Sequence, residues 1–266
     1  MARISQKPVR TKTAVNKKKY QTFFQHFYWP IIIPSLITLS AICFGLSAIR
    51  AVSVDSDYAI AMLFIAIAAG LDNIDGWAAR KLKAVSPIGA QLDSLADFLN
   101  FAVSPAFVMY QFSLYELQLY GWAVTLLFIF AGAFRLARFN TTIEDPSSKW
   151  KFFFQGVPTP AGAGMCLTPL ILYLANSENL TLSPWIIAVW MVITAILMVS
   201  SFPTYSSKNL KIKTNSQQAF AVLLLSGFII AIGKFGWGGL LSVATIYLLS
   251  LFISPFHFYA KNKKAK

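Results

Sequence analysis

Long apolar stretches alternate with short polar segments along the chain, and this pattern predicts a series of membrane-spanning helices. Each apolar stretch approaches the ~20 residues that a helix needs to cross the hydrocarbon core of a bilayer. We predict about eight such helices, at residues 29–51, 58–82, 89–112, 117–134, 158–174, 184–200, 218–232 and 237–253. The fold class that follows is an all-α integral membrane protein.

The composition agrees with that class. Of the 266 residues, 56% are hydrophobic and 12% are charged, and the mean hydropathy is +0.59. An ordinary soluble domain carries about 25% charged residues. We therefore predict four parts: a basic tail with an interfacial segment (1–28), a six-helix catalytic core (29–215), two additional C-terminal helices (216–256) and a second basic tail (257–266).

Positive charge is distributed unevenly between the polar segments. With eight spans, 21 of the 23 lysines and arginines lie on one side of the membrane, and Arg50 and Lys234 lie on the other. Because cytoplasmic loops are rich in basic residues, both termini are predicted to be cytoplasmic, in the cell inner membrane. The net charge of +13 then reflects topology, and no basic helix face indicates a nucleic-acid partner.

Four of the ten acidic residues lie within 26 positions in this apolar chain. Asp72 and Asp75 are three residues apart, and Asp93 and Asp97 are four apart, so each pair shares one face of a helix. A single aspartate at a helix end is usually a cap or a solvated charge. Four together at a membrane edge are costly, and such acids are usually functional.

The two pairs are predicted to face each other across a helical hairpin, with Ser86, Pro87 and Gly89 at the turn. Four carboxylates in a low-dielectric site repel one another, and bound divalent cations would remove that cost. Oxygen ligands suit a hard ion such as Mg²⁺ or Mn²⁺. A cation or proton pathway of a transporter would use such acids too, but it does not account for Gly76 or Arg80.

The spacing D-x2-D-G-x2-A-R-x8-G-x3-D-x3-D runs from Asp72 to Asp97 and resembles the signature of the CDP-alcohol phosphatidyltransferase family. The resemblance implies that a hydroxyl attacks the lipid-linked phosphorus of a CDP-activated lipid and that CMP is released. It implies two divalent ions, Mg²⁺ or Mn²⁺, with Asp72, Asp75 and Asp93 as the main ligands. Asp97 would complete the second metal site and accept the hydroxyl proton. A homodimer is also implied.

The same resemblance implies a site for CDP-diacylglycerol. Gly76 would let backbone approach the nucleotide, Arg80 would bind phosphate, and Ser86 would lie in the nucleotide site. Upstream, Pro-Ser-Leu-Ile-Thr at residues 34–38 resembles the family's Pro-Asn-x-x-Thr element of the nucleotide pocket, with Ser35 where asparagine is usual. Ser35 and Thr38 are equally compatible with hydrogen bonds inside their own helix.

Two further stretches resemble the serine-using members of the family, and together the resemblance covers about residues 30–170. One is Gln-Leu-Asp-Ser-Leu-Ala-Asp-Phe at 91–98, and the other combines residues 134–140 with 154–163. They imply L-serine as the acceptor and phosphatidylserine as the product. Serine brings a carboxylate that needs a cation, and Arg135 and Arg138 are candidates, although both could be positive-inside anchors. Glycerol phosphate, inositol phosphate and choline remain alternative acceptors.

Overall fold

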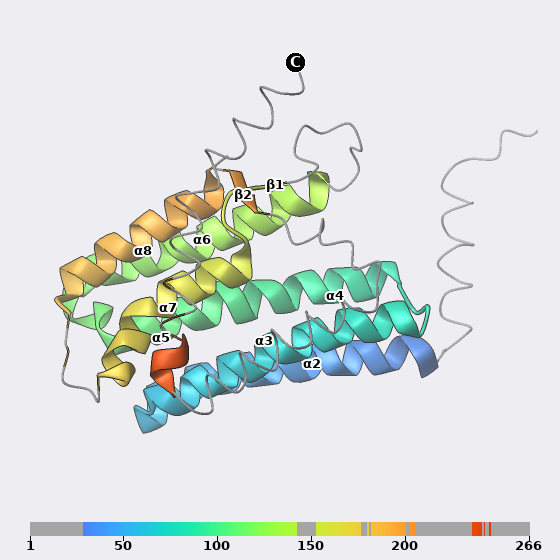
Figure 1. The fold of residues 1–266 in the computed structure, drawn as a ribbon, viewed down its shortest axis with the longest axis horizontal. Coiled ribbons are helices and arrows are strands. Elements are labelled where there is room, and N and C mark those ends of the chain that lie inside the picture. Colours follow the sequence, from blue (N-terminus) through green and yellow to red (C-terminus); the bar gives the residue numbers. More distant parts are fainter. Residues whose placement is uncertain are drawn as a thin grey trace, which may run out of the picture.

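The structure, a computed structural model, describes residues 29–142, 153–176, 180, 182–200, 203–205, 236–240, 242 and 245. Almost all of these residues are helical (Figure 1). In chain order the elements are α2 (Trp29–Arg50), η1 (Ala51–Asp55), α3 (Tyr58–Lys81), α4 (Pro87–Phe98), η2 (Leu99–Val103), α5 (Ser104–Phe112), η3 (Leu114–Leu117), α6 (Leu119–Thr142), β1 (Phe153–Gln155), α7 (Thr159–Ala175), α8 (Pro184–Val199) and β2 (Pro203–Tyr205).

Four of the helical stretches are long and apolar enough to cross a membrane. They are Ile32–Asp55, Tyr58–Lys81, Pro87–Phe112 and Leu119–Thr141, while α7 and α8 are shorter apolar helices. Many large apolar side chains on these helices are exposed, as a lipid environment allows and water does not. The prediction of a helical integral membrane protein is confirmed. Most of the seventh and eighth predicted spans lies outside the described residues.

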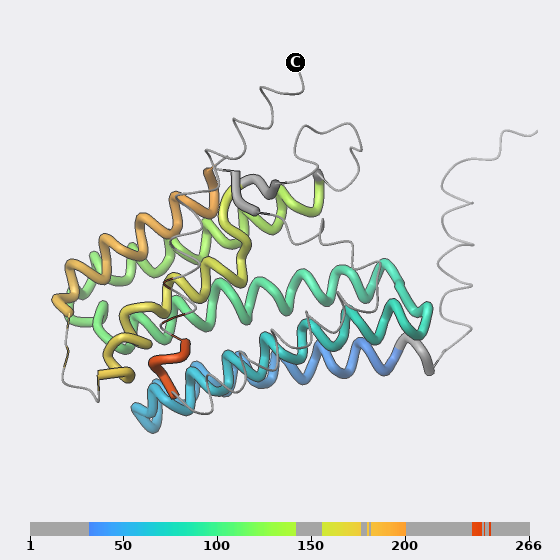
Figure 2. Tube along the Cα trace, in the orientation of Figure 1, coloured from blue at the N-terminus to red at the C-terminus, as the bar shows by residue number. Residues whose placement is uncertain are grey.

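The helices run alternately up and down. In Figures 1 and 2, α2 and α3 lie side by side, α4 continues through η2 into α5, and α8 lies along α6. The N-terminus of α2, the α3–α4 turn and the C-terminus of α6 therefore lie at one end of the bundle. Between α6 and α7, and again after α8, the chain contributes β1 and β2, which form an antiparallel ladder in which Phe154 pairs with Thr204.

The ends of α3 and α4 have clear local causes. Asp57 caps α3, where its Oδ1 accepts a hydrogen bond from Ile60 N at 2.9 Å. Ser86 caps α4 in the same way, because its Oγ accepts from Gly89 N at 3.0 Å, and Pro87 occupies the first helical position. Gly89 thus lies in the first turn of α4, which begins two residues before the predicted start of the third span.

The end of α6 also differs from the prediction. The fourth span was expected to end at Phe134, but the helix continues to Thr142. The residues that follow Phe134 include leucine, alanine and two arginines, all of which favour helix. Between Phe134 and the end of the helix there is no glycine or proline to terminate it. Arg135 consequently lies within a helix and is 7% exposed, instead of marking a helix end at the membrane surface.

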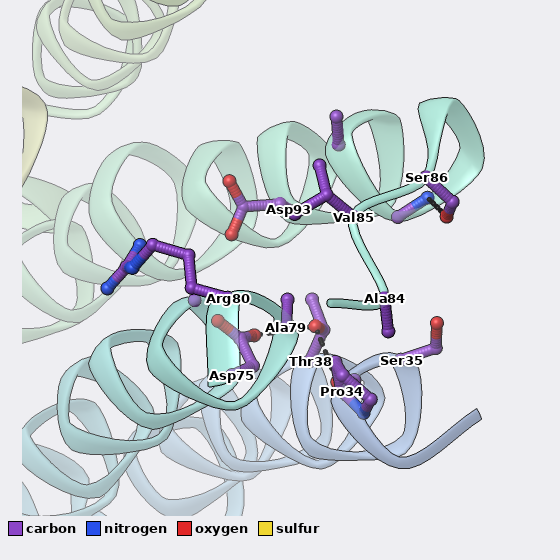
Figure 3. A pocket seen from close by; sticks show the side chains of 13 residues that line it. Pro34, Ser35, Thr38, Asp75, Ala79, Arg80, Ala84, Val85, Ser86 and Asp93 are labelled. Atoms are coloured by element: carbon purple, nitrogen blue, oxygen red, sulfur yellow. Dashed lines mark hydrogen bonds between the residues drawn. The ribbon is translucent and has the colours of Figure 1, made fainter. Parts of the chain in front are cut away.

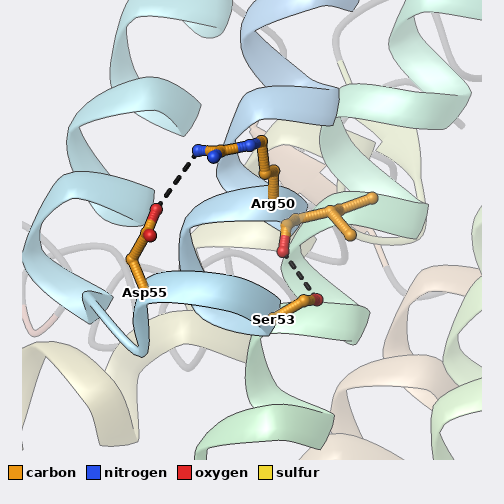
Figure 4. A network of polar contacts seen from close by, with 4 residues as sticks. Arg50, Ser53 and Asp55 are labelled. Atoms are coloured by element: carbon orange, nitrogen blue, oxygen red, sulfur yellow. Dashed lines mark hydrogen bonds and ion pairs between the residues drawn. The ribbon is translucent and has the colours of Figure 1, made fainter.

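The opposite end of the bundle carries a different set of charges. There, α2 passes into the π-helix η1, and Arg50 forms an ion pair with Asp55 at 3.2 Å (Figure 4). Ser53 Oγ donates to the carbonyl of Ile49 at 2.8 Å. The two side chains of the ion pair are 68% and 52% exposed, so the pair contributes little to stability. These charges are far along the helices from the aspartate pairs.

Candidate active site

Three aspartates come together where α3 and α4 meet. One carboxylate oxygen from each of Asp72, Asp75 and Asp93 lies within 4.8 Å of the others. The first two project from the last turns of α3 and the third from α4, and Figure 3 shows Asp75 and Asp93 facing the same gap. The helical hairpin predicted from the spacing thus brings together three of its four carboxylates.

The fourth aspartate stands slightly apart from this group. Asp97 is one helical turn beyond Asp93 on α4, and its carboxyl group lies beside that of Asp72. It is not among the three residues whose oxygens lie within 4.8 Å of one another. Asp97 is therefore adjacent to the cluster and linked to it through Asp72.

The cluster has the properties that a divalent cation requires. All its donors are carboxylate oxygens, which Mg²⁺ and Mn²⁺ prefer. Asp75 is 3% exposed, and the Oδ1 atoms of Asp72 and Asp75 are buried and have no hydrogen-bond partner in the structure. Buried acceptors are normally satisfied, so buried carboxylate oxygens without a donor fit a bound cation.

A pocket of about 270 Å³ opens beside the cluster between α2, α3 and α4 (Figure 3). Its lining combines two parts of the sequence that are about 40 residues apart: the upstream element (residues 34–38) and the aspartate signature (residues 72–97). The lining residues are Pro34, Ser35, Thr38, Asp75, Gly76, Ala79, Arg80, Ala84, Val85, Ser86, Gly89, Ala90 and Asp93. All five residues predicted to contact CDP-diacylglycerol therefore border one pocket.

Within that pocket, Thr38 makes a contact that the sequence did not indicate. Its Oγ1 lies 2.5 Å from Asp75 Oδ2 and 3.0 Å from the carbonyl oxygen of Pro34. Both groups can accept the hydroxyl hydrogen, and the bond to a carboxylate is the stronger when that carboxylate is ionised. Thr38 is 4% exposed. The single hydroxyl hydrogen can thus hold the Asp75 carboxylate in place, while the carbonyl of its own helix, the predicted partner, is also within hydrogen-bond distance.

Arg80 and Ser86 occupy different positions around the pocket. Arg80 is exposed, and its positive charge interacts with Asp93 across the gap between the helices. Its guanidinium lies over Gly76, where an added Cβ would come within 3.4 Å of Nη1. Ser86 is buried, and its Oγ accepts the capping bond at the start of α4. Arg80 is therefore placed for an anion in the pocket, while Ser86 also shapes the turn.

The two candidate arginines on α6 have different surroundings. Arg138 donates from Nη1 to the carbonyl oxygen of Val199 at 2.8 Å and from Nη2 to that of Ser200 at 3.2 Å. Arg135 is buried, donates from Nη1 to Thr159 Oγ1 at 2.7 Å, and interacts electrostatically with Asp97. The structure thus brings Arg135 to the carboxylate site and Arg138 to the end of α8. The role of Thr159 was missed, because nothing in its sequence position indicates the contact.

The helices and the carboxylate cluster define an integral membrane protein with a candidate metal centre near one end of its spans. The chain belongs to the CDP-alcohol phosphatidyltransferase family, whose sequence model matches residues 31–199. Members of this family generally use divalent metal ions.

Several similar proteins carry the same name, CDP-diacylglycerol–serine O-phosphatidyltransferase. The chain is 38% identical over 196 residues to the one from Mycobacterium tuberculosis (strain H37Rv), covering 73% of this chain and 68% of that protein. The Bacillus subtilis protein is 37% identical over 184 residues, covering 67% and 96%. The Methanocaldococcus jannaschii protein is 32% identical over 180 residues, covering 67% and 77%.

Proposed function

We propose that this protein transfers the phosphatidyl group of CDP-diacylglycerol to the hydroxyl of L-serine, giving phosphatidylserine and CMP. The observation that carries the proposal is the pocket in which the upstream element and the signature meet, directly beside three carboxylates within 4.8 Å of one another. The names of the similar proteins support serine as the acceptor. The reaction makes the protein a transferase of phospholipid biosynthesis.

Different residues of the site have different roles in this reaction. Asp72, Asp75 and Asp93, with a contribution from Asp97, would hold two divalent ions, Mg²⁺ or Mn²⁺. Such ions neutralise a diphosphate and stabilise its leaving oxygens. Arg80 would add a planar pair of donors for phosphate oxygens.

The serine oxygen forms a bond to the lipid-linked phosphorus, and the bond from that phosphorus to the CMP oxygen breaks. Asp97 takes the hydroxyl proton. Its position beside Asp72, outside the three-carboxylate group, supports this separate role. Ser35, Gly76 and Ser86 would contact the nucleotide from the walls of the pocket.

The test is release of CMP by the purified protein from CDP-diacylglycerol in the presence of single alcohols. We expect CMP release that depends on L-serine and a divalent ion, with phosphatidylserine as the lipid product. Release that depends instead on glycerol phosphate, inositol phosphate or choline would move the acceptor to that alcohol. If no CMP is released with any of these alcohols, the proposed transferase activity is contradicted and the transporter alternative remains.

We also propose that the site faces the cytoplasm, in the cell inner membrane. Lys83 follows α3 at the site end of the bundle, and Glu116 lies in η3 at the other end. The excess of basic residues at the site end supports this orientation. The predicted division into tails, core and two further C-terminal helices, and the homodimer, remain part of the same proposal.

Single cysteines placed at residues 83 and 116 test the orientation. In a background with Cys43→Ser and Cys166→Ala, a membrane-impermeant thiol reagent added outside intact cells should label position 116 but not position 83. Labelling of 83 after the cells are opened is the internal control. Both positions labelled from outside, or only position 83, would contradict a cytoplasmic site.

Thr38→Val tests the bond to Asp75. Valine keeps the shape of the side chain but cannot donate, so the carboxylate loses the group that orients it. We expect the Mn²⁺ concentration for half-saturation to rise ~10-fold, in the range typical for groups that support metal ligands. Measurements are Mn²⁺ binding by electron paramagnetic resonance and CMP release against metal concentration.

Thr125→Val is the matched control, since Thr125 is fully buried and its hydroxyl donates to Gly121 O in its own helix at 2.9 Å. Thr38→Ser should retain most of the metal affinity. Equal Mn²⁺ affinity in Thr38→Val and Thr125→Val would show that the hydroxyl does not orient a metal ligand.

A further inference from the structure

The two arginines on α6 serve different purposes, and the difference lies in what each contacts. The last carbonyl groups of a helix have no partner within the helix. Arg138 supplies one at the end of α8, where it donates to the carbonyl oxygens of Val199 and Ser200. Arg138 therefore links α6 to the C-terminal end of α8.

Arg135 points into the protein instead. Its side chain is 7% exposed, and its charge interacts with that of Asp97, which we have assigned as the base. A buried charge is costly unless other groups compensate it. A guanidinium in such a place matches a carboxylate well, because its planar donors fit both carboxylate oxygens. The orientation of Arg135 is therefore the property that decides what it can bind.

Thr159 is a residue on α7 that contributes to this orientation. Its Oγ1 accepts from Arg135 Nη1 at 2.7 Å, and it is fully buried at the first position of α7. Pro158 and Pro160 flank it, and each proline restricts the backbone. Threonine is also branched at Cβ, which limits its rotamers. The hydroxyl thus presents a rigid acceptor from α7 to an arginine on α6.

We propose that Thr159 is a positioning residue that holds Arg135 toward Asp97. Arg135 then binds the carboxylate of the acceptor alcohol, and the hydroxyl of the same acceptor contacts Asp97. This inference rests on the proposed function and extends it to acceptor choice. A small hydroxy amino acid carries both groups within reach of a neighbouring cation and base. An alcohol without an anionic group, such as ethanolamine or choline, offers Arg135 no matching anion, so the pair selects against it.

Thr159→Val tests the proposal, because valine keeps the shape and removes the acceptor oxygen. We expect the KM for L-serine to rise roughly 10-fold, as loss of a hydrogen bond to a charged group predicts. The kcat should change less than threefold and the KM for CDP-diacylglycerol should stay the same. Ethanolamine is serine without its carboxylate. The ratio of kcat/KM for serine to that for ethanolamine should therefore fall about as much as the serine KM rises.

Two variants separate this effect from general damage to the fold. Thr194→Val makes the same change at a fully buried threonine on α8 whose hydroxyl donates to Trp190 O at 2.9 Å, and it should leave the serine KM unchanged. Thr159→Ser restores the oxygen and should recover most of the serine affinity. If Thr159→Val does not yield folded protein, Arg135→Lys replaces it. Lysine keeps the charge but lacks the planar fork, so the serine KM should rise in that variant too.

The outcomes are distinct. A serine KM in Thr159→Val that matches the Thr194→Val control would overturn the positioning role while leaving serine as the acceptor. Equal losses in serine KM, CDP-diacylglycerol KM and kcat would mark Thr159 as structural and overturn it as well. If the wild-type protein releases no CMP with serine, the proposed function fails first, and this inference fails with it.

Discussion

Asp75→Asn is expected to lower serine-dependent CMP release by ~10²–10³-fold or more, the loss typical when a group that stabilises developing charge is removed. Asp75 is 3% exposed, its Oδ2 is held by Thr38, and its Oδ1 is buried without a hydrogen-bond partner. Asparagine keeps the size of the side chain but removes the charge and puts an NH₂ group where an oxygen stood. The site then loses a ligand with little change in shape.

The measurements are CMP release at saturating substrates and Mn²⁺ binding by electron paramagnetic resonance. Asp57→Asn is the matched control, because Asp57 lies before α3 at the opposite end, where its Oδ1 caps the helix. Asparagine caps nearly as well, so this variant should keep its activity. Near-normal turnover of Asp75→Asn at ordinary Mg²⁺ would mean that the carboxylate cluster is not the metal site.

The helices and the aspartate cluster could be predicted because both depend on local spacing. Apolar length sets each span, and separations of three and four residues put two carboxylates on one helix face. The hairpin between α3 and α4 then brings the two faces together over a short turn. The helix bounds predicted for the first six spans agree with the structure to within a few residues, apart from the end of α6, and four of these helical stretches are long enough to cross a membrane.

The remaining features depend on contacts between distant parts of the chain. Thr38 and Asp75 are 37 residues apart, and Arg135 and Thr159 are 24 apart. Periodicity within one helix does not say which neighbouring helix a side chain meets. The end of α6 was misplaced for a related reason: an arginine was taken to mark the membrane surface, whereas Arg135 is buried against a partner on α7.

Asp97→Asn should separate catalysis from substrate binding. As the base, Asp97 accepts the serine proton, and a positioned general base contributes ~10²–10⁴-fold. Asparagine is nearly isosteric and can still hydrogen-bond to Asp72, but it cannot take up the proton. We therefore expect turnover to collapse by about that factor while affinity for CDP-diacylglycerol in detergent stays close to that of the wild type.

Asp72→Asn is the informative comparison, because the same change is made in the carboxylate beside Asp97. Asp72 belongs to the three carboxylates within 4.8 Å of one another, and its Oδ1 is buried without a hydrogen-bond partner. Removing its charge should weaken the hold on the ions that bind the diphosphate, so both turnover and CDP-diacylglycerol affinity should fall. Should Asp97→Asn lose lipid affinity as completely as Asp72→Asn, Asp97 acts as a metal-holding residue, and the proton must go elsewhere.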